Sequence, residues 1–108
     1  MRKLTIIREK TFVASAGKME IYLLSNDGDV EINGRKFILL DKIKNGKEFH
    51  TEISDEKGYL HMCYFGSKNF NPATYNIQAG NQNITIYLKA KFGPFSGNPI
   101  TITKVMEH

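Results

Sequence analysis

The feature that most restricts the fold of this chain is an alternation of apolar and polar residues with a period of two, which recurs between short turn motifs. Strands show this period because successive side chains point to opposite faces of a sheet. No long stretch keeps the spacing of three and four residues that marks one face of a helix. We therefore expect the chain to be built mainly from strands.

The alternating segments define a series of expected strands, which are residues 4–8 with 11–13, 18–24, 30–32, 36–40, 40–43, 47–53, 59–65, 84–92 and 99–105. Residues 26–29 form a turn between two of them. Asn33-Gly34 and Asn45-Gly46 each lie between two alternating segments, and Asn-Gly is the preferred pair of a type I′ hairpin turn. We expect two successive hairpins there. A third turn at 55–58 then continues the middle of the chain as a meander.

Two segments interrupt this pattern. Residues 66–83 are rich in Asn, Gly, Ser and Gln and are expected to form a long loop, in which only 73–77 has the character of a short strand or helical turn. Residues 93–98 form a second loop that contains an aromatic residue. Short strands at this spacing in a chain of 108 residues predict one domain over 1–108, an all-β, Ig-like antiparallel β-sandwich of about seven to nine strands.

Part of the chain resembles PEGA-type repeats, in which an Ile-Asn-Gly-Lys turn is followed by a second Asn-Gly turn and a strand. The matching residues are Ile32-Asn33-Gly34, the segment 40–46 and the strand 49–53, within about residues 18 to 65. With 8–12 and 95–100, the chain also resembles small uncharacterised bacterial β-sandwich proteins. The Gly-x-His element that closes a PEGA repeat is only approximated by 58–61. The resemblance implies a fold and supplies no catalytic residue.

Charge and cysteine content bound the partners and the compartment. The formal net charge of +4 and the pI near 9.2 favour encounters with anionic partners, but the lysines and arginines are interleaved with acids and form no long run. Cys63 is the only cysteine, so no internal disulfide forms, and we expect a reducing compartment, by default the cytoplasm. No apolar run reaches the roughly 18 residues that a membrane span needs.

Candidate chemical sites are few. His61 and Cys63 share a face if their segment is a strand, and both are zinc ligands. If 47–53 and 59–65 pair as a hairpin, Thr51 lies opposite His61 and Phe49 opposite Cys63, so no third ligand joins them. Residues 26–31 lack the spacing of a calcium loop. Nucleophile, phosphate and dinucleotide motifs are absent from the sequence, so we expect no metal, no cofactor and no enzyme activity.

A binding role has more support in the sequence. Aromatic, basic and amide side chains lie in or beside the two loops, and such side chains stack on sugars or bases and hold acidic groups. The candidate ligand-binding residues are Phe70, Tyr75, Lys89, Lys91, Phe92, Phe95 and Asn98. The alternative is that these rings cap the core. The leading hypothesis is a non-enzymatic protein-interaction or accessory module that pairs through an edge strand, with a partner or with itself. A carbohydrate- or nucleic-acid-binding module is the alternative.

Overall fold

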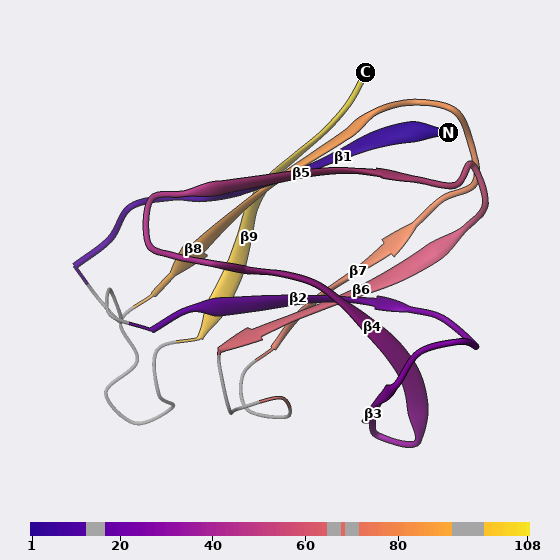
Figure 1. The fold of residues 1–108 in the computed structure, drawn as a ribbon. Helices are drawn as coiled ribbons and strands as arrows, with labels where there is room; N and C mark the ends of the chain where they lie inside the picture. Colours follow the sequence, from indigo (N-terminus) through magenta and orange to yellow (C-terminus); the bar gives the residue numbers. More distant parts are fainter. Residues whose placement is uncertain (13–16, 65–67, 69–71, 92–98) are drawn as a thin grey trace.

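Two β-sheets face each other in the computed structural model, which describes residues 1–12, 17–64, 68, 72–91 and 99–108 (Figure 1). The five-stranded sheet has the order β3-β4-β2-β6-β7, and the four-stranded sheet has the order β5-β1-β8-β9. The strands are β1 (Arg2–Arg8), β2 (Met19–Leu24), β3 (Val30–Ile32), β4 (Arg35–Ile43), β5 (Glu48–Ile53), β6 (Gly58–Tyr64), β7 (Ala73–Ile77), β8 (Ile84–Ala90) and β9 (Ile100–Glu107). The expected all-β sandwich is confirmed, and the described residues contain no helix long and apolar enough to span a membrane.

The main core lies between the two sheets. Alternate residues of every central strand point into it, for example Leu4 and Ile6 of β1 and Ile84, Ile86 and Leu88 of β8. Met19, Ile21, Leu60 and Met62 of β2 and β6 meet them from the other sheet. Burial of such side chains contributes about 1.5 to 3 kcal/mol each, so this layer supplies most of the stability.

A second apolar cluster, here called the outer cluster, lies on the opposite face of the five-stranded sheet. It consists of Tyr22, Ile32, Phe37 and Cys63, with Leu24, Val30 and Tyr59 packed against them. Both faces of β2 and β6 are therefore covered, which is why the burial of these two strands does not alternate.

The expected hairpin at Asn33-Gly34 is confirmed. Both residues have positive φ, 52° and 79°, as a type I′ turn requires, and β3 pairs with β4 around them. Among the described strands, one pair departs from the antiparallel pattern, because β1 and β8 run parallel with Leu4 opposite Ile84.

The second and third expected hairpins are wrong. β4 and β5 lie in different sheets, and so do β5 and β6. At Asn45-Gly46 only Gly46 has positive φ, 74°, so the turn is not of type I′ and does not return the chain beside β4. The Asn45 side chain instead binds the backbone of Thr11, accepting from its N–H at 3.0 Å and donating to its carbonyl at 2.9 Å.

The expected long loop over 66–83 is interrupted by β7, which pairs with β6 from Gly58 opposite Ile77 to Met62 opposite Ala73. The strand alternative for 73–77 is therefore the one observed. Residues 65–67 and 69–71 lie outside the described residues, as does the expected loop 93–98.

A bulge bends β4. Its pairing with β2 shifts between Ile21, which lies opposite Asp41, and Tyr22, which lies opposite Leu39, so Leu40 is an extra residue. A bulge bends its strand and increases the local twist. In Figure 1, β4 accordingly curves away from β5 toward β3, although the two strands are joined by the short turn at 44–47.

Candidate functional site

The seven candidate ligand residues are only partly described. Phe70, Phe92, Phe95 and Asn98 lie outside the described residues. Tyr75 faces the sandwich interior, because it is half-buried against the main core opposite Leu60. Its hydroxyl donates to Glu107 Oε1 at 3.4 Å, and burial together with Glu107 raises the pKa of this tyrosine.

Lys89 and Lys91 are exposed. Lys89 points away from the core, because its neighbours Leu88 and Ala90 are buried. Lys91 follows β8, and its N–H donates to the Pro99 carbonyl at 2.9 Å. Lys89 therefore belongs to the four-stranded sheet and Lys91 directly follows it, whereas Tyr75 belongs to the interior face of the other sheet.

His61 and Cys63 share a face as expected, but their strand neighbours differ from the expected ones. Because β6 pairs with β2, Tyr22 lies opposite His61 and Glu20 opposite Cys63, in place of Thr51 and Phe49. All four residues are buried, each with an exposed fraction of 4% or less. Within the described part of the chain, no group of three His, Cys, Asp or Glu side chains is arranged to hold a metal ion.

The polar groups of this face are internally paired. Tyr22 donates to Glu20 Oε1 at 2.8 Å, and Lys42 Nζ lies 3.8 Å from Glu20 Oε2. His61 Nε2 donates to the Lys68 carbonyl at 2.6 Å. Burial, and then Glu20, raise the pKa of Cys63 to about 11, so its thiol stays protonated near neutral pH and is a weak nucleophile. The arrangement holds Lys68 against the sheet and satisfies buried groups.

The edge of β5 offers a different kind of site. Arg8 N–H donates to the Lys47 carbonyl, so these two residues form a hydrogen-bonded pair. From there along β5, non-hydrogen-bonded and hydrogen-bonded pairs with β1 follow each other in alternation. The backbone N–H and C=O groups of Glu48, His50 and Glu52 consequently point away from β1, toward the open edge. No described strand pairs with that edge.

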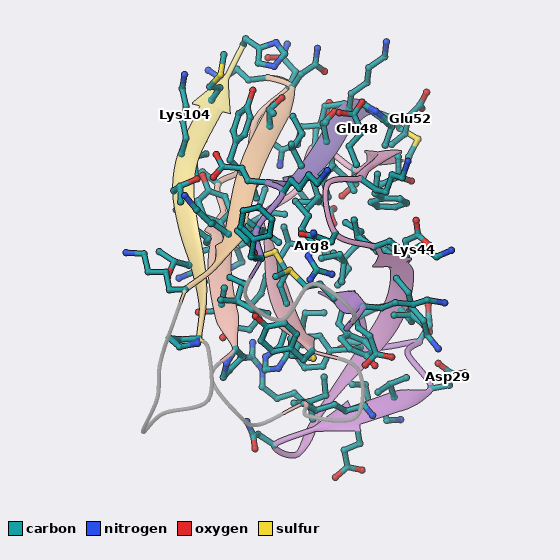
Figure 2. All side chains as sticks on the ribbon, turned by 90° about the vertical axis from the view of Figure 1, so that its left-hand side faces the viewer. Arg8, Asp29, Lys44, Glu48, Glu52 and Lys104 are labelled. Carbon is teal, nitrogen blue, oxygen red and sulfur yellow. The ribbon has the colours of Figure 1, made fainter. Side chains whose placement is uncertain are left out.

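The side chains of Glu48, His50 and Glu52 are exposed on the outer face of the sheet, while Phe49, Thr51 and Ile53 point inward. His50 Nε2 lies 2.8 Å from Glu48 Oε1, and its Nδ1 lies 3.1 Å from Thr5 Oγ1. Figure 2 shows Glu48 and Glu52 at one side of the molecule and Lys104, on β9, at the other.

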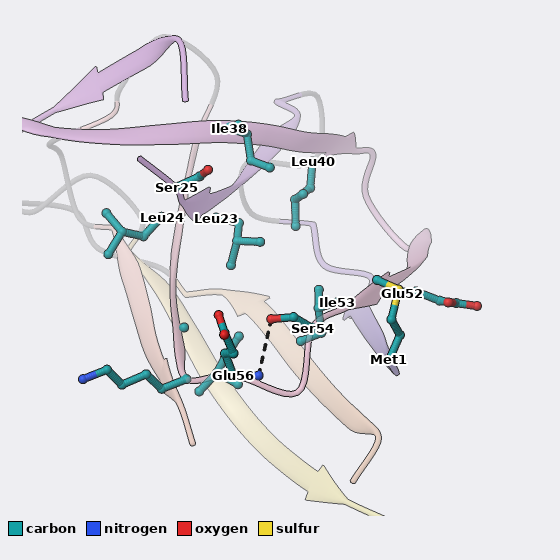
Figure 3. A pocket seen from close by; sticks show the side chains of 13 residues that line it. Met1, Leu23, Leu24, Ser25, Ile38, Leu40, Glu52, Ile53, Ser54 and Glu56 are labelled. Carbon is teal, nitrogen blue, oxygen red and sulfur yellow. Dashed lines mark hydrogen bonds between the residues drawn. The ribbon is translucent and has the colours of Figure 1, made fainter. Parts of the chain in front are cut away.

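A cavity of about 430 Å³ opens beside this edge, between the end of β5 and the inner faces of β2 and β4. Figure 3 shows Leu23, Ile38 and Leu40 facing Ile53 and the turn that contains Ser54 and Glu56. The complete lining comprises Met1, Leu23, Leu24, Ser25, Ile38, Leu40, Glu52, Ile53, Ser54, Glu56, Lys57, Gly58 and Ile77. The lining is thus mixed, with apolar side chains from β2, β4, β5 and β7 beside polar and charged residues of β5 and of the turn that follows it.

Arg2 holds one wall of this cavity in place. Its side chain is 3% exposed, and its guanidinium donates to three backbone carbonyls, from Nε to Ser54 at 3.0 Å and from Nη2 to Glu56 at 2.9 Å and Gln78 at 2.8 Å. The turn after β5 is therefore fixed to the end of β7. Bonds from a charged donor are stronger than neutral ones, so this clamp makes the rim rigid.

The burial of two arginines, Arg2 and Arg8, was not predicted from the sequence. Arg8, at the other end of β1, is 1% exposed and donates to the carbonyls of Gly17 and Ile43. A signal was present, because Arg2 and Arg8 are in phase with the core residues Leu4 and Ile6 along one strand. The cavity itself had no local sequence signal, because it depends on which sheet each strand joins.

No family model matches this chain, and no curated protein is detectably similar to it. The arrangement of the described residues therefore carries the functional argument.

Proposed function

We propose that this β-sandwich is a non-enzymatic protein-interaction module that binds an extended segment of a partner along the open edge of β5. The observation that supports it is the combination of backbone groups at Glu48, His50 and Glu52 that no described strand pairs with and a cavity, lined partly by apolar side chains, at the end of the same strand. Backbone hydrogen bonds give such strand addition its affinity, and pockets for alternate side chains give it specificity.

The other edges support this choice by contrast. β3 has three residues, and β7 has five. β9 is longer, but its pairing with β8 shifts between Tyr87 and Leu88, and Lys104 is exposed next to the shift. A bulge and a lysine are the usual means of protecting an edge from strand addition. β5 pairs with β1 in an unbroken register over six residues and has neither feature.

The proposal includes a finer assignment of the fold. We propose a PEGA-like, Ig-like domain, supported by the type I′ turn at Asn33-Gly34 within the Ile-Asn-Gly motif. The alternative function, carbohydrate or nucleic-acid binding, has the support of two exposed cations, Lys89 near the end of β8 and Lys91 just after it.

The test uses two substitutions of one residue. His50→Pro removes the outward N–H and blocks strand addition, while the bonds between β5 and β1 remain, because Pro is tolerated where the N–H faces solvent. His50→Ala is the matched control, since it removes the same side chain and keeps the N–H. Thermal unfolding of both variants checks that the fold is intact.

Peptides from a random displayed library are selected on the wild-type protein and measured against both variants. We expect His50→Ala to retain binding and His50→Pro to weaken it at least about tenfold, which corresponds to 1.4 kcal/mol. Selected peptides that bind His50→Pro as well as the wild type would refute the β5 edge. Binding of oligonucleotides or glycans that is lost in a Lys89→Ala and Lys91→Ala double variant would favour the alternative.

A further inference from the structure

We infer that the segment bound at β5 is one in which apolar and basic residues alternate, the apolar side chains entering the cavity and the basic ones lying beside Glu48 and Glu52. This inference rests on the proposed function and adds the chemistry of the partner. It is carried by two features of the same edge, the apolar side chains that line part of the cavity at the end of β5 and the acidic side chains on the outer face of the strand.

The apolar half follows from the unequal sheets. The four-stranded sheet ends at β5, whereas the facing sheet continues past β4 to β3. A strand added beside β5 would lie opposite this edge of the facing sheet, where Ile38 and Leu40 of β4 line the cavity. Because side chains alternate across a sheet, every second residue of the added strand would point toward Ile38 and Leu40, into the cavity of about 430 Å³.

The basic half follows from the outer face. Glu48 and Glu52 are exposed there, and the following turn adds exposed Asp55 together with Glu56, which lines the cavity. Two cations counter part of this charge, because the amino group of Met1 lies 3.7 Å from Asp55 and Lys57 lines the rim. Lys3 lies opposite Glu52, but on the β1 side. Toward the open edge itself the strand presents acids and His50.

This local acidity is opposite in sign to the net charge of the chain, +4. At physiological ionic strength charges farther apart than roughly 8 Å are largely screened, so the neighbouring carboxylates decide which side chains an added strand carries. Opposite charges on neighbouring strands stabilise a sheet and like charges destabilise it. Lys or Arg at the outward positions of the partner is therefore favoured over Asp or Glu.

A second copy of this chain fits the edge less well. Two β5 strands paired antiparallel about His50 would place Glu48 of each against Glu52 of the other. β7 and β9 of one molecule contact each other across the sandwich. If β9 of a second copy were added to β5, β7 of that copy would therefore come to the position that β3 of the first copy occupies. A single extended segment without its own facing sheet avoids both conflicts.

The experiment measures the affinity of fluorescent capped peptides of about eight residues. One alternates Val and Lys, one alternates Val and Glu, and one alternates Thr and Lys. Thr has nearly the shape of Val and retains strand propensity, so the third peptide tests the apolar contact alone. We expect the Val/Lys peptide to bind at least tenfold more tightly than either of the others.

A charge reversal of the protein provides the second arm. In a Glu48→Lys and Glu52→Lys double variant the preference should invert, so that the Val/Glu peptide binds more tightly than the Val/Lys peptide. The matched control is Asp27→Lys with Asp29→Lys, which makes the same change of charge in an exposed turn and should leave the original preference.

The outcomes separate the two proposals. Equal binding of the Val/Lys and Thr/Lys peptides, or an unchanged preference after charge reversal, overturns this inference. If library peptides of another composition still require the His50 N–H, only the inference fails; if none requires it, the proposed function fails too. Dimerisation of the protein alone that His50→Pro abolishes would identify a second copy as the occupant and would also overturn the inference.

Discussion

Replacement of Arg2 by Leu should remove the clamp on the cavity wall and destabilise the protein by about 3 to 5 kcal/mol. The guanidinium makes three bonds to the carbonyls of Ser54, Glu56 and Gln78, with lengths of 2.8 to 3.0 Å. A bond from a charged donor contributes about 1.5 to 3 kcal/mol, and the desolvation of a buried cation offsets part of the total. Some of the released carbonyls will also regain water.

The assay is equilibrium unfolding in urea followed by circular dichroism. With the slope expected for a domain of this size, about 1 to 3 kcal/mol per molar, the midpoint should fall by roughly 2 M. Lys3→Leu is the matched control, because Lys3 is exposed on the same strand, and it should change the stability by no more than about 0.5 kcal/mol. A loss below about 1 kcal/mol for Arg2→Leu would show that these bonds do not stabilise the rim.

Three further predictions test other parts of the structure. Gly34 has φ of 79° and open space where a Cβ would lie, so Gly34→Ala should cost only about 1 to 2 kcal/mol of backbone strain. Gly28→Ala should cost more, because its Cβ would meet the backbone carbonyl of Phe37, and equal melting temperatures for the two variants would contradict this. Cys63 should react with a thiol reagent at pH 8 many times faster in urea than in the folded protein, and equal rates would contradict its burial and raised pKa. The pKa of Cys63 is raised from 9.0 to about 11, so the protonated thiol contributes stability that is present below pH 9 and is lost as the pH rises through 11. The urea midpoint of Cys63→Ala should therefore fall less between pH 8.5 and 11 than the midpoint of the wild type. An identical fall in the two proteins would refute this linkage.

Local turn chemistry explains which hairpin could be predicted from the sequence. Asn33-Gly34 adopts positive φ at both residues, as the dipeptide favours, and the strands on either side pair. Asn45-Gly46 is the same dipeptide, but the Asn45 amide binds the backbone of Thr11, far away in the sequence. A contact of this kind has no signature near residue 45, so the exchange of sheets between β4 and β5 could not be read from the turn.

Strand parity carries more information about the site than residue type does, although it was not used to predict the buried arginines. The alternation along β1 places Arg2 and Arg8 on the same face as Leu4 and Ile6, so their burial follows from position although arginine is usually exposed. Likewise, His61 and Cys63 were expected on one face and lie on one face. Their neighbours Glu20 and Tyr22 could not be predicted, because they depend on the pairing of β6 with β2 instead of β5.

Features on both sides fix the position of the cavity beside β5, and this affects how tightly the edge can bind a partner segment. On one side the extra residue Leu40 bends β4 away, and on the other side Arg2 ties the turn after β5 to the end of β7. Neither wall depends on a bound partner for its position. Because β5 is already ordered by its pairing with β1, an added segment would bear nearly all the cost of ordering itself, and rigidity in the partner should improve affinity. A peptide constrained to an extended form should therefore bind more tightly than its flexible counterpart, mainly through slower dissociation.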